Sequence, residues 1–398
     1  MAQQQELSPD QQVLRGIFPD VPDISEDSYN IISNTFGTCT FRLQLSTEPK
    51  PDFPTDLLVR LETSGGRLLD VARYQRLACL QNPTVVPATL DVGFTTNASG
   101  TRLEYSVTPF LGETVLLEDV WNDLEQRTQS SLMDSIVDAM AKHQELPVGN
   151  DDVRRLLQLP GQMDQVSTSS VEPLIGGPDV GYHASIKQLL AGFLGEEAGK
   201  SPTCKILDTA NGIAIRSLSD DIGEIELSQA DLDILCARLV LCHNDLEPRN
   251  ILVKLTSPGE AGPGTWYELA AIIDWELAGF FPFAYEFGLK DCLLGSSNLS
   301  FTWYSLFKER AAALLPEGES HDKLIKALRI IAQSKDLGRP RNVGVRFQAR
   351  WRERERLELS SDPRRGWVRQ TGAENIPTST KEDDANLEHE VLRELGYM

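Results

Sequence analysis

Two stretches decide the fold of this chain: LVLCHNDLEPRNILV, residues 239–253, and AAIIDWELAG, residues 270–279. In the first, an apolar run leads into His243, and Pro248 interrupts the chain before a second apolar run begins. This pattern predicts a polar loop held between two buried elements.

The segment between the two stretches predicts a β-hairpin. Residues 251–255 and 266–273 both have the composition of strands, and a Pro- and Gly-rich turn separates them. Pairing of these strands would bring Asp274 back towards Asn250. We therefore expect side chains from two separate motifs to meet at one end of the hairpin.

The residue types at this meeting point suggest phosphoryl transfer. The Asn250 amide and the Asp274 carboxylate supply the hard oxygen ligands that Mg²⁺ prefers. Asp245 is then free to orient an acceptor hydroxyl and take up its proton. A short segment with Asp, Pro and Asn can also be an ordinary turn, but the order H-x-D-x-x-x-x-N, strand, turn, strand, Asp is much harder to meet by chance. We expect His243 to brace the loop rather than carry protons.

The segments His243–Asn250 and Ile273–Glu276 resemble the catalytic motifs of the aminoglycoside phosphotransferase and choline kinase group. The resemblance implies a protein-kinase-like bilobal α+β fold, with a small β-rich lobe and a larger helical lobe. It also implies Asp245 as the catalytic base, Asn250 and Asp274 as Mg²⁺ ligands, and ATP as the phosphate donor.

The first half of the chain resembles this group more weakly. Its first turn, SNTFGTCT, contains a single glycine, Gly37, and reads as an ordinary hairpin. Arg60 ends a strand where a kinase-like fold places the lysine that holds the nucleotide phosphates. Arginine supplies the same charge with a different geometry, and an exposed strand arginine is the alternative.

Two further nucleotide-binding features are expected from the resemblance. Asp70 is the only acid in the predicted helix 67–80, so it is the candidate ion-pair partner of Arg60, with a surface helix-terminal aspartate as the alternative. Thr108 and Phe110 lie where the family has a hinge whose backbone binds adenine. Between them, Pro109 lacks an N–H group.

The composition limits the partners. The formal charge is −21 and the pI is near 4.7, which disfavours binding to nucleic acid or to anionic membranes. Six scattered cysteines without a C-x-x-C pair favour reduced thiols. The polar N-terminal sequence does not resemble a signal peptide, and no stretch has the length and apolarity of a membrane span. We therefore expect a cytoplasmic protein that binds a nucleotide and a small-molecule acceptor.

We predict four regions along the chain. Residues 1–28 form a mobile arm with one short helix, 29–111 form the nucleotide-binding small lobe, and 112–335 form the catalytic lobe with an acceptor-binding insertion at 147–230. Residues 336–398 combine a basic helical segment with a partly disordered tail. The arginines of this last region are expected to pair with glutamates of the same solvated helix rather than with nucleic acid.

The predicted function is Mg²⁺-dependent transfer of the γ-phosphate of ATP to a hydroxyl of a small molecule. A catalytically weak pseudokinase that binds nucleotide as a scaffold is the alternative, favoured by the poor phosphate loop, Arg60 and Asp70. A protein kinase is disfavoured because D-F-G and A-P-E segments are absent from the sequence. The acceptor, the choice of ATP over GTP and the oligomeric state are not encoded in any of these motifs.

Overall fold

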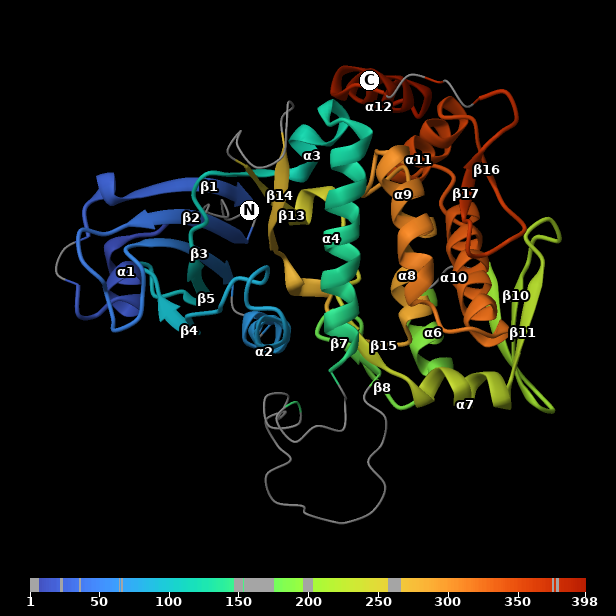
Figure 1. Cartoon of the computed structure of the whole chain (residues 1–398), viewed down its shortest axis with the longest axis horizontal. Coiled ribbons are helices and arrows are strands. Elements are labelled where there is room, and N and C mark those ends of the chain that lie inside the picture. Colours follow the sequence, from blue (N-terminus) through green and yellow to red (C-terminus); the bar gives the residue numbers. More distant parts are fainter. Residues whose placement is uncertain are drawn as a thin grey trace, which may run out of the picture.

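The protein has a β-rich N-terminal lobe and a larger, mainly helical C-terminal lobe (Figure 1). This architecture confirms the predicted bilobal α+β fold class. The computed structural model describes residues 7–21, 24–35, 37–63, 65, 67–146, 153, 175–195, 203–256, 266–373, 376 and 379–398.

The small lobe is built on a five-stranded antiparallel sheet with the order β1-β2-β3-β5-β4. Along β2 and β3, fully buried side chains alternate with less buried ones, as expected when one face of a sheet covers a core. The five strands are β1 (Tyr29–Thr35), β2 (Thr38–Gln44), β3 (Asp56–Thr63), β4 (Asp91–Thr96) and β5 (Arg102–Pro109).

Helix α1 (Gln11–Ile17) packs into the small lobe through its apolar side. Val13, Leu14 and Ile17 are fully buried in one cluster with side chains of β2, β3 and β5. The Asp10 side chain caps the helix by accepting a hydrogen bond from the Val13 N–H. The prediction of a mobile arm is therefore wrong for residues 7–21, because they bury apolar surface against the sheet.

The chain leaves the small lobe through β6 (Thr114–Leu116), which pairs with β13 (Ile251–Leu255) of the large lobe. On its other side, β13 pairs with β14 (Tyr267–Ile272), so the predicted hairpin is present. Helices α3 (Leu117–Val120) and α4 (Gln126–Gln144) follow β6, and α4 packs against β14 (Figure 1). The small lobe is thus joined directly to the strand that follows the catalytic loop.

Helix α8 (Phe283–Leu293) lies at the centre of the large lobe. Every residue from Phe283 to Asp291 is buried, and a Cβ at Gly288 would come within 2.9 Å of Leu328 on α10, so the two helices pack closely. The other large-lobe helices are α6 (Ile186–Leu194), α7 (Gln229–Ala237), α9 (Phe301–Ala311) and α10 (Glu319–Leu337).

Two small sheets complete this lobe. One has the order β12-β15-β7-β8 and the other the order β11-β10-β9. Their strands are β7 (Ile175–Gly177), β8 (Gly181–His183), β9 (Cys204–Thr209), β10 (Gly212–Ser217), β11 (Glu224–Ser228), β12 (Val240–Cys242) and β15 (Gly279–Phe281). The first part of the predicted acceptor-binding insertion, including the Ser/Thr run at 167–170, lies outside the described residues.

The C-terminal region packs on the large lobe (Figure 1). It contains α11 (Val343–Arg354), a hairpin of β16 (Leu357–Leu359) and β17 (Trp367–Arg369), and α12 (Lys381–Glu394).

Arg350 contacts Glu353 one turn later on α11 at 3.2 Å, a pair of the kind expected within this helix. The pairs of Glu353 with Arg356 and of Arg354 with Glu358, which the spacing also predicts, are not found among the described residues, because α11 ends at Arg354. Arg350 also contacts Glu394 of α12 at 3.2 Å, so the basic residues both pair within α11 and fix it to α12.

All six cysteines are free thiols, as predicted, and three of them are fully buried. In the part of the chain that the structure describes, no helix has both the length and the apolar character needed to cross a membrane.

Candidate active site

The loop at residues 243–250 is anchored to the segment that follows β14. Asn244 adopts the left-handed conformation with a φ of 63°, which asparagine tolerates better than most residues. Its backbone N–H donates to Glu286 Oε1 at 3.1 Å, and its side-chain Nδ2 donates to the Leu277 carbonyl at 2.8 Å. Glu286 is therefore a structural residue that supports the loop.

His243 joins the loop to the end of β14. Its Nε2 donates to the Ile273 carbonyl at 2.9 Å, while its Nδ1 accepts from the Asp245 N–H at 3.3 Å. This pattern requires a neutral ring protonated on Nε2. Burial of the ring lowers the pKa of His243 to about 4. The structure therefore supports the predicted bracing role.

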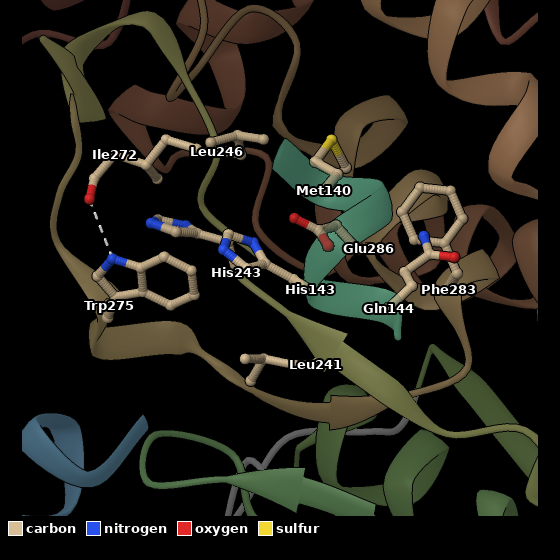
Figure 2. A pocket seen from close by; sticks show the side chains of 10 residues that line it. All are labelled: Met140, His143, Gln144, Leu241, His243, Leu246, Ile272, Trp275, Phe283 and Glu286. Carbon is tan, nitrogen blue, oxygen red and sulfur yellow. Dashed lines mark hydrogen bonds between the residues drawn. The ribbon is translucent and has the colours of Figure 1, made fainter. Parts of the chain in front are cut away.

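Next to the loop, the rings of His143, His243 and Trp275 pack around a small cavity (Figure 2). The rings of His243 and His143 contact Trp275 edge-on, with centroids 4.7 and 5.2 Å away. Burial, followed by the neighbouring His243, lowers the pKa of His143 to about 3. The cavity between these rings and Glu286 has a volume of about 10 Å³, room for about one water molecule, so it is not a substrate pocket.

Asp245 is held by two neighbours from its own loop. Its Oδ1 and Oδ2 lie 2.6 and 2.8 Å from Arg249 Nη2, and Asn250 Nδ2 donates to Oδ2 at 2.8 Å. Asn250 Nδ2 also donates to the Asp245 carbonyl at 2.7 Å. Because Asn250 Nδ2 donates to Asp245, the amide oxygen of Asn250 points away from Asp245.

Asp274 lies next to Asn250 because of the hairpin register. Ile251 pairs with Ile272, and the Ile273 N–H donates to the Asn250 carbonyl at 2.9 Å. Asp274 then turns in the left-handed conformation with a φ of 63°. The structure thus brings together Asp245, Asn250 and Asp274, the three residues that the two motifs predict to meet.

The environment of Asp274 fits a cation ligand. Its Oδ1 is buried without a hydrogen-bond partner. Burial, followed by the nearby Glu276 carboxylate, raises the pKa of Asp274 to about 7. In the described parts of the chain, no three His, Cys, Asp or Glu side chains group as a metal site. An ion held by Asp274 and Asn250 would therefore take its remaining oxygen ligands from a bound phosphate or from water.

Arg60 reaches this site from the small lobe. Its guanidinium contacts Glu276 at 2.5 Å and Glu62 at 2.6 Å, and its Nη1 lies 3.7 Å from Asp274 Oδ1. Arg67, at the start of α2 (Arg67–Gln81), contacts the second oxygen of Glu276 at 2.6 Å. Two arginines of the small lobe are thus bound to the carboxylate that closes the second motif.

The expected ion pair between Arg60 and Asp70 is absent from the described structure. Asp70 instead contacts Arg73 one turn later on α2, at 2.7 Å. The prediction was wrong because it assumed that α2 supplies the acid. Here, α2 supplies a cation, Arg67, and the acids come from β3 and from the loop after β14.

At the predicted adenine hinge, one backbone N–H already donates a hydrogen bond within the protein. The Phe110 N–H donates to the Asp56 carbonyl at 3.0 Å and extends the β3–β5 pairing, while the Phe110 ring packs under Arg42. Phe110 can therefore hydrogen-bond adenine only through its backbone carbonyl. Thr108 is half-buried in β5, opposite Leu58 of β3.

Sequence reasoning missed Arg249, Arg67 and the contacts of Glu276. Arg249 lies four residues after Asp245, a spacing that favours contact within one turn, so its role could have been suspected. Arg67 is separated from Glu276 by more than half of the chain, and no local pattern connects them.

One protein family matches the part of the chain that contains this site. The model of the phosphotransferase enzyme family matches residues 41–289, which is more than half of the chain and contains both motifs. No curated protein gives a significant match.

Several solved structures are similar at low sequence identity. The GDP complex of aminoglycoside 2'-phosphotransferase-IIIa is 14% identical, with 96% of each chain covered and a TM-score of 0.44. A spectinomycin phosphotransferase in complex with ADP and spectinomycin is 10% identical, with 91% of this chain and 88% of that chain covered and a TM-score of 0.37. Both scores are below 0.5, so the assignment rests on the family match. The chain belongs to the phosphotransferase enzyme family.

Proposed function

We propose that the protein is an Mg²⁺-dependent kinase that transfers the γ-phosphate of ATP to a hydroxyl of a small molecule in the cytoplasm. The observation that carries this proposal is the meeting of Asp245, Asn250 and Asp274 at the end of the β13–β14 hairpin. Family membership supports phosphoryl transfer as the reaction class.

Asp245 is the group that takes the proton from the acceptor. Oδ2 already accepts hydrogen bonds from Arg249 and Asn250, whereas Oδ1 accepts from Arg249 alone. A carboxylate oxygen has two lone pairs, so Oδ1 keeps one for the acceptor hydroxyl. The acceptor oxygen then bonds to the γ-phosphorus, the bond to the bridging oxygen breaks, and ADP leaves.

Asn250 and Asp274 would hold Mg²⁺, since both present oxygen atoms and the partly exposed Asp274 carboxylate lies close to other acids. When bound, the ion neutralises charge on the transferring phosphate. Arg60 faces the same region with a half-exposed guanidinium and steadies the nucleotide phosphates. Thr108 and Phe110 remain our candidates for contact with the base.

The alternative, a pseudokinase scaffold, gains one observation from the structure. Both arginines near the expected phosphate position are engaged with Glu62 and Glu276, so a nucleotide must compete with internal ion pairs. The complete set of Asp245, Asn250 and Asp274 favours the enzyme.

An ADP-release assay with MgATP separates the two functions. We expect turnover that depends on one class of acceptor in a panel of amino alcohols and aminoglycosides. Turnover should disappear in Asp245→Ala. Nucleotide binding in the presence of Mg²⁺ without ADP release for any acceptor in the panel would favour the scaffold. Equal turnover by wild type and Asp245→Ala would refute the role of Asp245.

A further inference from the structure

Arg249 connects the proposed catalytic base to a loop of the large lobe. One side of its guanidinium binds both oxygens of Asp245, and its Nη1 donates to the Ser297 carbonyl. The Arg249 side chain is only one-third exposed. Its planar fork can satisfy both partners at once in one orientation. The position of the Ser297 carbonyl therefore affects the orientation in which Arg249 binds Asp245.

The loop that contains Ser297 is tightly folded. Gly295 has a φ of 86°, and its N–H donates to the Asn298 carbonyl at 2.8 Å. The Ser297 N–H donates to the Leu293 carbonyl at 3.1 Å. Asn298 is buried, and its Oδ1 accepts from the Ser300 N–H at 2.8 Å. The Ser297 carbonyl is thus presented to Arg249 by an ordered turn between α8 and α9.

Helix α11 holds this turn from the other side. The Gln348 side chain is buried, and its Nε2 donates to the carbonyls of Cys292 and Leu294 at 2.8 and 2.9 Å. A Cβ at Gly295 would lie 3.1 Å from both Gln348 and Trp351, so α11 is packed directly on the turn. Helix α11 lies outside residues 41–289, the part that matches the family.

We propose that Gln348 and Arg249 are positioning residues that set the orientation of Asp245. In this arrangement, α11 fixes the turn at 293–298, the turn fixes Arg249, and Arg249 holds the carboxylate so that Oδ1 faces the acceptor. The inference rests on the proposed role of Asp245 as the base. It assigns to the C-terminal region an indirect part in catalysis, through the orientation of Asp245, that packing alone would not require.

The chain of contacts predicts non-additive effects on turnover. Gln348→Met keeps the length of the side chain but removes both donors, and a displaced catalytic group can cost up to about a hundredfold in rate. We expect Gln348→Met to lower kcat by about three- to tenfold, with the KM for MgATP nearly unchanged. A loss of this size corresponds to the interaction energies measured between coupled residues. Arg249→Gln should lower kcat at least as much. In the Arg249→Gln background, Gln348→Met should have no further effect, because the connection is already broken.

The matched control is Arg350→Gln, on the exposed side of the same helix, which should leave kcat unchanged. Arg249→Lys should restore part of the lost kcat, because lysine keeps the charge but cannot bridge both partners with the same fork. Independent, multiplicative losses in the double variant would overturn the proposal. So would a Gln348→Met variant with the kcat of wild type, or one that raises the KM for MgATP as much as it lowers kcat.

A second readout does not depend on the identity of the acceptor. Hydrogen exchange of the amides at 243–250 should become faster in Gln348→Met and not in Arg350→Gln. If Asp245→Ala keeps full turnover, the proposed role of Asp245 as the base fails, and this exchange experiment still decides whether α11 stabilises the loop. Unchanged exchange in Gln348→Met would contradict the connection itself.

Discussion

Substitution of His143 by glutamine should change how the stability of the protein depends on pH. His143 is buried at the end of α4, its ring contacts Trp275, and its Nε2 has no hydrogen-bond partner (Figure 2). Burial, followed by the nearby His243, lowers its pKa from 6.5 to about 3. Glutamine retains a polar side chain that fills part of the same space, but it cannot take up a proton.

The magnitude follows from proton linkage. Between pH 6.5 and about 3, the unfolded protein carries a proton on His143 and the folded protein does not. Stability therefore decreases as the pH falls through this window. At pH 5, which is 1.5 units below 6.5, this single histidine costs about 2 kcal/mol of unfolding free energy, at about 1.36 kcal/mol per unit. Above pH 7 the cost vanishes.

Urea unfolding of wild type and His143→Gln at pH 7 and pH 5 measures this effect. We expect the variant to be less stable at pH 7, because contacts with Trp275 are lost. At pH 5 the difference should shrink by about 2 kcal/mol. His389→Gln is the control, because His389 is exposed on α12. A difference between wild type and His143→Gln that is the same at both pH values would refute the reasoning.

Three further predictions concern the charged residues around the site. Lys290→Met should destabilise the protein by about 3–5 kcal/mol in urea unfolding, because it leaves the buried Glu247 carboxylate unpaired. Adding Glu247→Gln to this variant should recover part of the lost stability. A Lys290→Met protein as stable as wild type would contradict the prediction. Arg67→Gln should raise the KM for MgATP by up to about fivefold, since a partly exposed ion pair contributes about 1 kcal/mol at most. The control, Arg73→Gln, should leave this KM unchanged, and equal effects of the two substitutions would argue against a role for Arg67. Asp274→Asn should remove the Mg²⁺ dependence of nucleotide binding measured by calorimetry, and a retained dependence would place the ion elsewhere.

Local sequence patterns predicted the strand pairing that brings Asp274 close to Asn250. The observed strand β13 has the predicted bounds, 251–255, and it pairs antiparallel with β14 as expected for the two strands of a hairpin. Register then places Asp274 beside Asn250 without any long-range information. His243 was correctly expected to brace the loop, because a buried histidine with two backbone partners is fixed in one neutral form.

The ion pairs between lobes could not be predicted in the same way. Arg60 was placed near the site, but Glu276 became its partner because of how the lobes pack, while its second partner, Glu62, lies on the same strand. Residues 204–228 form three strands that were not expected. Their pairing depends on contact with α10, which lies about a hundred residues later in the chain. The apolar pattern at residues 85–92 also predicts a strand, but β4 begins only at Asp91, because Val85 takes part in a turn.

In the proposed mechanism, Asp245 takes up the proton of the acceptor while other residues bind the nucleotide. Phosphate transfer and MgATP affinity in Asp245→Asn, which keeps the size of the side chain, distinguish these two roles. We expect ADP release with the best acceptor to be lost, while the Kd for MgATP stays within about twofold of wild type, because nucleotide binding does not use the base. Phosphate transfer at the wild-type rate by Asp245→Asn would show that Asp245 is not the base.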